Sequence, residues 1–349
     1  MNFTSVQLPR RIIFGTGRVS ELGEEIKALG ISRPIAVSTP GGANRANAIL
    51  GASSVVAARF NGAEMHAPAE CVERALSAAK NADADGVIAC GGGSAVGIAK
   101  AMAVSSYRPI VAITTTYSGS EMTPVYSMTR EGAKTGGQSI DVLPKLVIYD
   151  PELTLDLPVP ISVTSALNSL AHCVEGLYSI QRDPMVDRMA SDAIGLIAKS
   201  LPKIVEQPNS IVDRENLLYA SCLGGMVMTS AGMALHHKAC HVLGGTFGLP
   251  HAETHAVLLP YVMRYNDSVA HHAMSIIEHE IKQPDAPFAI YSLGQAVGAP
   301  RGLKALGMPE EGLNKAAEMI VNAPYYNPRT PEIAGILDML RAAWSGEAP

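Results

Sequence analysis

The chain has 349 residues, of which 47% are hydrophobic and 17% charged, and this composition excludes a disordered chain and provides enough apolar residues for two domains. Its 27 Lys and Arg are scattered among 32 Asp and Glu, and the net charge of −5 gives no sign of a nucleic-acid or membrane partner. The five cysteines show no CxxC spacing and the N-terminal stretch has no apolar signal segment, so we expect a cytoplasmic protein with reduced thiols.

The first part of the chain alternates strands with helices. Short apolar runs predict strands, and segments with apolar residues at helical spacing lie between them. The predicted strands are Arg11–Phe14, Pro34–Ser38, Val87–Cys90, Ile110–Ile113 and Lys145–Tyr149, and the predicted helices are 19–29 and 67–81. Such alternation is typical of a parallel, Rossmann-like sheet flanked by helices.

Beyond Pro158 the pattern becomes helical. The predicted helices are 162–180, 185–200, 214–228, 231–243, 268–281, 288–297 and 311–321. We therefore predict an α/β dinucleotide-binding domain over 1–155 and an all-α catalytic domain over 156–349, with the ligand in the cleft between them. The uncharged stretch 217–235 approaches membrane-spanning length, but its glycines and hydroxyls favour two buried helices instead.

A glycine-rich loop follows the predicted strand that ends at Cys90. Gly91, Gly92, Gly93 and Ser94 would let the backbone approach a pyrophosphate at the start of a helix. The loop is not GxGxxG, and no acidic residue follows about twenty residues later to hold a ribose hydroxyl. An ordinary strand-to-helix turn is the alternative, and phosphate binding is the better interpretation.

A second loop, Thr114-Thr115-Thr116-Tyr117-Ser118-Gly119-Ser120-Glu121, follows the next predicted strand. It should open on the same carboxyl edge of the sheet, where ligands of α/β proteins bind. We expect Thr114, Thr115 and Ser118 to contact a cofactor. Ser118 and Glu121 would also suit a helix cap, and the two roles are compatible.

Histidines gather in the helical part. Asn168 and His172 are four residues apart, as are His237 and His241, so each pair shares a helix face. His251 follows a turn marked by Gly248 and Pro250 and could join them. One carboxamide and these imidazoles nearly make a divalent-metal site, but no carboxylate sits at these spacings.

Five ordered motifs span essentially the whole chain: GGGSAVGIAKA, TTTYSGSE, IYDPELTLDLP, ALNSLAHCVEG and HHKACHVLGGTFGLPHAETHAVLLP. Together they resemble the iron-containing (group III) alcohol dehydrogenase superfamily, which includes glycerol dehydrogenase and, more remotely, dehydroquinate synthase. The resemblance implies a dehydroquinate synthase-like architecture, a nicotinamide cofactor and a homodimer.

In metal-dependent members of that superfamily, an Asp and three His bind the cation. The matching positions here are Asn168, His172, His237 and His251, with His241 as an additional histidine of the pattern. Asn168 supplies no negative charge, and Gly97 stands where the metal enzymes usually carry an Asp. The chain therefore resembles the maleylacetate reductase branch, which works without metal.

This resemblance implies reduction of the conjugated C=C bond of maleylacetate, a small dicarboxylate, to 3-oxoadipate in aromatic-compound degradation. We assign stabilisation of the enolate oxygen to His172, His237 and His251, and orientation or proton relay to His241. Asn168, Tyr117, Ser118 and Lys238 are candidates for binding the substrate.

Thr39 ends the second predicted strand, where NAD-selective relatives tend to carry an acid, so both NADH and NADPH are plausible cofactors. We expect no metal. His236, His255 and Lys100 are expected to be structural or surface residues without a catalytic role.

Three alternatives stay open. One is a metal-dependent alcohol or glycerol dehydrogenase of the same superfamily. The others are a lyase of the dehydroquinate synthase type, for which basic phosphate-binding residues are few, and a nucleotide-binding protein without activity.

Overall fold

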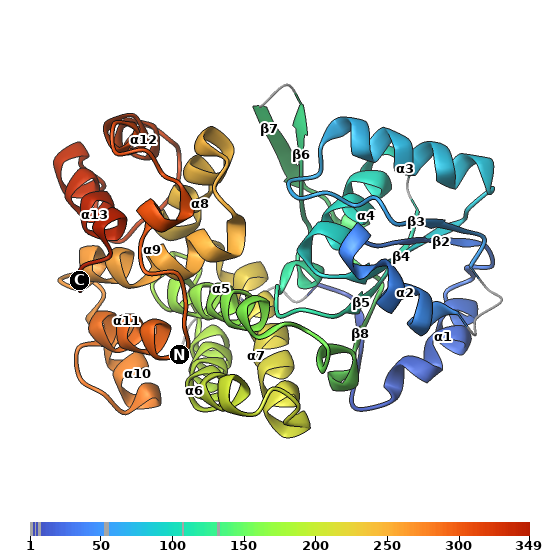
Figure 1. Ribbon diagram of the computed structural model, residues 1–349, viewed down its shortest axis with the longest axis horizontal. Helices are drawn as coiled ribbons and strands as arrows, with labels where there is room; N and C mark the ends of the chain where they lie inside the picture. Colours follow the sequence, from blue (N-terminus) through green and yellow to red (C-terminus); the bar gives the residue numbers. More distant parts are fainter. Residues whose placement is uncertain (1–2, 4, 6–7, 52–55, 107, 131–132) are drawn as a thin grey trace. The chain divides into compact units, whose positions relative to one another are not determined.

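The computed structural model describes the chain apart from residues 1–2, 4, 6–7, 52–55, 107 and 131–132 (Figure 1). The chain divides into two compact units, with the division after Leu157. The first unit carries the α/β elements, and the second runs from Pro158 to Pro349.

A six-stranded parallel sheet forms the centre of the first unit (Figure 1). Its strands lie in the order β1-β8-β5-β4-β2-β3, and every neighbouring pair is parallel. They are β1 (Arg11–Phe14), β2 (Pro34–Val37), β3 (Ala58–Phe60), β4 (Gly86–Gly91), β5 (Ile110–Thr114) and β8 (Leu146–Tyr149). This confirms the predicted α/β fold of the N-terminal half.

Helices cover both faces of this sheet. Alternate residues of β4 point to opposite faces, so Val87 packs in one hydrophobic core and Ile88 in the other. The core around Val87 includes residues of α3 (Ala69–Asn81) and α4 (Gly93–Ser106). The core around Ile88 includes residues of α1 (Leu22–Ala28) and α2 (Ala43–Leu50). β4 thus reads as one continuous apolar run because both of its faces are buried.

The sequence did not predict the antiparallel hairpin of β6 (Val125–Arg130) and β7 (Ala133–Gln138), and it also missed β3 and α2. The β6 side chains are exposed or half-buried, and Gly136 and Gly137 interrupt the β7 pattern. Its alternation is therefore weak. The short 3₁₀ helices of this unit are η1 (Arg18–Glu21), η2 (Pro40–Gly42), η3 (Ser120–Met122), η4 (Ile140–Val142) and η5 (Pro151–Thr154).

The second unit is helical throughout its described residues, as predicted. Its helices are α5 (Val159–Leu177), α6 (Pro184–Glu206), α7 (Ile211–Ala231), α8 (Leu235–Phe247), α9 (His251–Asn266), α10 (His271–Ile281), α11 (Ala286–Ala296), η6 (Leu303–Leu306), α12 (Gly312–Val321) and α13 (Ile333–Ser345).

Several helix boundaries differ from the prediction by a few residues, and two helices of this unit were not predicted. α8 begins at Leu235 and not at Ala231, because Gly232 takes a φ of 74° and ends α7. α9 and α13 were not predicted, and Pro260 inside α9 disguises its helical pattern.

The apolar stretch 217–235 is divided between α7 and α8. No single helix among the described residues has the length and hydropathy to cross a membrane. α7 and α8 reach that length only as a pair, with a bend of 101° at the break between them.

Candidate functional site

Three loops of the first unit emerge at the carboxyl ends of neighbouring strands. Gly91 pairs with Thr114 at the ends of β4 and β5, and the Thr115 N–H donates to the Gly91 carbonyl at 3.2 Å. Thr39 follows β2, the other neighbour of β4, and its hydroxyl accepts from the Gly42 N–H at 3.1 Å. The structure therefore brings the glycine loop, the threonine loop and Thr39 to one edge of the sheet.

The glycine loop has the geometry of a phosphate cradle. Gly91 has a φ of 152°, which only glycine adopts readily. A Cβ added to Gly92 would lie 2.5 Å from Thr116 Oγ1, so the two loops approach too closely for any side chain there. α4 begins at Gly93, and Ser94 lies in its first turn, where unpaired backbone N–H groups attract anions. These residues fit the pyrophosphate of a dinucleotide.

The buried carboxylate of Glu121, at the end of the threonine loop, accepts two side-chain hydrogen bonds. Tyr149 Oη donates to Glu121 Oε1 at 2.7 Å, and Ser118 Oγ donates to Glu121 Oε2 at 3.3 Å. The expected Ser118–Glu121 pairing is therefore present, and it makes Glu121 part of a buried network. Tyr117 is also fully buried.

Lys100 contradicts the expectation of a surface charge, because it is 1% exposed. Its Nζ donates to the carbonyls of Ser120 and Thr123, each at 2.7 Å, and so ties α4 to the end of the Ser118 loop. Burial lowers the pKa of Lys100 to about 7, and burial raises the pKa of Glu121. Sequence reasoning missed this burial, since Lys100 lies in an apolar helix whose faces are all covered.

Six imidazoles from three helices form one connected cluster in the second unit. α5 supplies His172, α8 supplies His237 and His241, and α9 begins at His251. The ring centroids lie 5.0 Å apart for His172 and His237, 6.4 Å for His237 and His241, and 6.5 Å for His241 and His251. The structure thus brings together the four histidines that the sequence singled out. The remaining two rings are His236 and His255.

The sequence left a structural or a surface position open for His236 and His255, and the structure places both in the interior. Both are fully buried, and their ring centroids lie 4.8 Å apart. The His255 ring also lies 4.6 Å from that of His237 and 4.3 Å from that of His251, between centroids. His255 joins the cluster because it lies one helical turn after His251 on α9.

Glu175 is the functional residue that the sequence reasoning missed. Its Oε2 accepts from His237 Nδ1 at 2.5 Å, and its Oε1 accepts from the backbone N–H of His236 at 2.7 Å. The carboxylate therefore binds the first turn of α8 and the ring of His237 together. Its spacing of three residues after His172, on the same helix face, was the available signal.

Burial controls the charge of the cluster. It lowers the pKa of His172 and of His255 well below the ordinary value, and neighbouring histidines add to the effect. Burial also lowers the pKa of His236, to about 4. Burial raises the pKa of Glu175, but the adjoining His237 outweighs it, so the net shift is downward and the group stays a carboxylate.

The donors at the superfamily's metal positions do not fit a ferrous or zinc centre. Asn168, buried on α5 one turn before His172, offers a neutral carboxamide. Among the described residues, the carboxylate that contacts the cluster is that of Glu175. Its two oxygens already accept hydrogen bonds from the backbone N–H of His236 and from the ring of His237. We therefore derive no catalytic step through a metal.

Lys238, the last of the proposed substrate contacts, lies next to the histidine cluster in the chain. Lys238 is half-buried on α8 beside His237.

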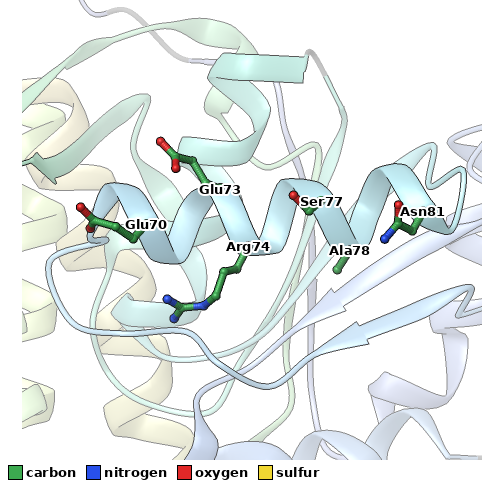
Figure 2. Close-up of a pocket in the computed structure, with 6 residues that line it drawn as sticks. All are labelled: Glu70, Glu73, Arg74, Ser77, Ala78 and Asn81. Carbon is green, nitrogen blue, oxygen red and sulfur yellow. The ribbon is translucent and has the colours of Figure 1, made fainter.

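A shallow hollow on the surface of α3 is lined by Glu70, Glu73, Arg74, Ser77, Ala78 and Asn81 (Figure 2). All six lie along one helix, and none was predicted to bind a ligand, so this hollow is no candidate for the active site.

Two family models match the chain. "Iron-containing alcohol dehydrogenase" matches residues 9–151, and "Fe-containing alcohol dehydrogenase family, C-terminal" matches residues 162–344. The chain therefore belongs to the iron-containing alcohol dehydrogenase superfamily, a class of oxidoreductases.

Full-length relatives specify the branch. The chain is 44% identical to the maleylacetate reductase of Pseudomonas sp. strain P51, over 100% of this chain and 99% of the relative. It is 39% identical to the crystal structure of maleylacetate reductase from Agrobacterium tumefaciens, with a TM-score of 0.94 and complete coverage of both chains. Within the superfamily, the chain belongs to the maleylacetate reductase branch.

A more distant neighbour was solved with a cofactor. Sulfoacetaldehyde reductase from Bifidobacterium kashiwanohense, in complex with NAD+, is 27% identical, with a TM-score of 0.89 and 99% coverage of both chains.

Proposed function

We propose that this chain reduces the conjugated C=C bond of maleylacetate to 3-oxoadipate with NADH or NADPH and without a metal. The single observation that carries the proposal is a buried imidazole cluster with a carboxamide at the matched metal position. The names of the full-length relatives support the substrate. The glycine and threonine loops of the first unit supply the cofactor site.

When bound in the loops of the first unit, the nicotinamide would supply a hydride to the carbon β to the ketone. Negative charge then develops on the ketone oxygen as an enolate, and the α carbon receives a proton. Preorganised hydrogen-bond donors stabilise such an oxyanion, and removal of one donor typically costs about 10²–10³-fold in kcat. His172, His237 and His251 are the proposed donors.

Glu175 determines what His237 can do. A carboxylate only accepts hydrogen bonds, so the Nδ1 of His237 carries the proton of that contact and Nε2 faces the cluster. When His237 is protonated, its positive charge lies against Glu175 and its Nε2–H can donate to the enolate oxygen or transfer a proton. His241 is exposed on the same helix and can relay a replacement proton from solvent.

The substrate carries two carboxylates that need partners. Lys238 and Asn168 are the proposed contacts in the helical unit, and Ser118 and Tyr117 those near the cofactor loops. We further propose a cytoplasmic homodimer acting in aromatic-compound degradation, and the five buried, unbridged cysteines agree with a reducing compartment.

The alternative is a metal-dependent alcohol or glycerol dehydrogenase of the same superfamily. An assay with purified protein separates the two, following nicotinamide absorbance with maleylacetate plus NADH or NADPH, and with glycerol or primary alcohols plus NAD+. We expect rapid oxidation of the reduced cofactor in the first mixture and no comparable rate in the second. The reverse result would reject the proposed function.

A further inference from the structure

Three of the buried rings face one another as metal ligands do. The ligand nitrogens available from His236, His237 and His255 all lie within 4.8 Å of one another. The ring centroids lie 5.4 Å apart for His236 and His237, 4.8 Å for His236 and His255, and 4.6 Å for His237 and His255. Each pair meets edge to face. The three rings therefore meet at steep angles and do not stack on one another.

In two of these rings, one nitrogen makes the hydrogen bond that the non-ligating nitrogen of a metal-bound histidine usually makes. His237 Nδ1 donates to the Glu175 carboxylate, and His236 Nε2 donates to the His255 carbonyl at 3.0 Å. Metal-ligating histidines almost always donate their other ring N–H to a carboxylate or a backbone carbonyl, which fixes the tautomer. His236 Nδ1 and His237 Nε2 are thereby left as the lone-pair nitrogens of their neutral rings.

Within the described structure, the lone-pair nitrogens of His236 and His237 are buried and accept no hydrogen bond. Neither His236 Nδ1 nor His237 Nε2 has a hydrogen-bond partner among the described residues. The same holds there for both ring nitrogens of His255, which is fully buried. A buried polar atom without a partner costs about 1–3 kcal/mol, so a ligand that satisfies three of them at once is favoured.

We propose that His236 Nδ1, His237 Nε2 and one ring nitrogen of His255 bind a zinc-class divalent cation. Tetrahedral Zn–N bonds of about 2.0–2.1 Å place ligand nitrogens about 3.4 Å apart, so nitrogens that lie up to 4.8 Å apart approach one another on binding.

This site differs from the superfamily's metal position. It shares His237 with that position but uses His236 and His255 in place of Asn168, His172 and His251. Three neutral imidazoles form a complete tridentate set that leaves the fourth tetrahedral position open.

The consequence for activity rests on the proposed function. The cation would occupy His237 Nε2, the atom assigned to the enolate. Zinc is therefore an inhibitor of this enzyme and not its cofactor, and its removal should restore the reductase rate.

The site is tested by metal binding, without reference to activity. Chelator-stripped full-length protein is titrated with Co²⁺ and Zn²⁺, with visible absorption and calorimetry as readouts. We expect one ion per chain, a tetrahedral Co²⁺ spectrum, and at least a tenfold rise in Zn²⁺ Kd in His255→Phe and His236→Phe. The matched control His251→Phe removes a ligand of the superfamily's position and should leave the Zn²⁺ Kd unchanged. Loss of binding in His251→Phe with retention in His255→Phe would overturn the proposal, as would the absence of binding in the wild-type protein.

A second variant and an activity measurement complete the test. His255→Gln removes a strong ligand but keeps a polar side chain, and a wild-type far-UV spectrum and melting temperature will show that it folds. Zinc should inhibit the wild-type reductase at least tenfold more strongly than His255→Gln, and equal inhibition would contradict the inhibitory role. If the protein does not reduce maleylacetate, the proposed function fails while the Co²⁺ spectrum still decides the metal site.

Discussion

Glu175 on α5 accepts the Nδ1–H of His237 on α8, and this contact determines which nitrogen of the His237 ring faces the cluster. The same carboxylate accepts the backbone N–H of His236, so α5 positions both the start of α8 and the His237 ring. A carboxylate held behind a histidine orients the ring and stabilises its charged form during proton transfer. Glu175 is therefore the positioning residue of the proposed mechanism.

Glu175→Gln tests this relationship. The amide can still accept a hydrogen bond but supplies no negative charge, so we expect kcat for maleylacetate to fall about 10–100-fold, as for other groups that orient a functional histidine. The KM for NADH should not change, because the cofactor loops lie in the other unit. Steady-state kinetics measure both constants. A variant with wild-type kcat and an unaltered melting temperature would remove Glu175 from the mechanism.

The glycine loop makes a second prediction. In Gly92→Ala the added Cβ meets Thr116 at 2.5 Å, so the loop must open and the Kd for NADH should rise at least tenfold. Gly97→Ala, on α4 just after this loop, meets nothing within 4 Å and is the matched control. Fluorescence titration with NADH compares the two. Equal affinities in both variants would show that close approach of the loops is not needed for binding.

The buried imidazoles predict a pH dependence of stability. The pKa values of His172, His236 and His255 lie below their unfolded value of about 6.5, and that of His236 is about 4. Between these values the unfolded chain binds protons that the folded chain does not, so the free energy of unfolding falls as pH decreases. Between its folded and unfolded pKa values, each such group lowers the free energy of unfolding by about 1.4 kcal/mol for each unit that the pH falls.

Urea unfolding between pH 7.5 and 5 measures this slope. His255→Phe should unfold with a slope smaller by about one proton, or about 1.4 kcal/mol per pH unit. An unchanged slope in the variant would mean that His255 takes up a proton in the folded state.

Asn168 makes a further prediction about metal. Asn168→Asp restores a carboxylate one turn before His172 and should raise the affinity for Zn²⁺ at least tenfold, because an anionic oxygen is a better ligand than a carboxamide. This added affinity should disappear in the double variant with His251→Phe. Calorimetric titration checks both, and unchanged zinc binding in Asn168→Asp would mean that Asn168 does not face the histidines.

The sequence predicted the parts of this structure that follow from periodicity and order. The parallel sheet, the glycine turn and the helical second half follow from apolar runs and turn residues such as Gly91. The i,i+4 pairs Asn168/His172 and His237/His241 indicated two faces of the cluster from their spacing alone. The comparison with relatives confirms the branch to which these motifs point.

The missed features depend on contacts between segments distant in sequence. Glu175 and His237 are separated by 62 positions, so no local pattern connects them. His236 and His255 meet because α8 and α9 pack together, and their positions in the chain suggested only structural roles. Lys100 is buried because η3 and β6 cover α4, which the sequence of α4 does not indicate.

Metal content and reductase rate, measured on the same sample, decide whether imidazoles stabilise the enolate without a metal. The purified protein is treated with a strong chelator, its metal content is determined, and the initial rate of NADH oxidation with maleylacetate is recorded before and after addition of Fe²⁺ or Zn²⁺. We predict full activity at less than one-tenth equivalent of metal, and no gain when either ion is added. Loss of activity on chelation, restored by Fe²⁺ or Zn²⁺, would contradict the account.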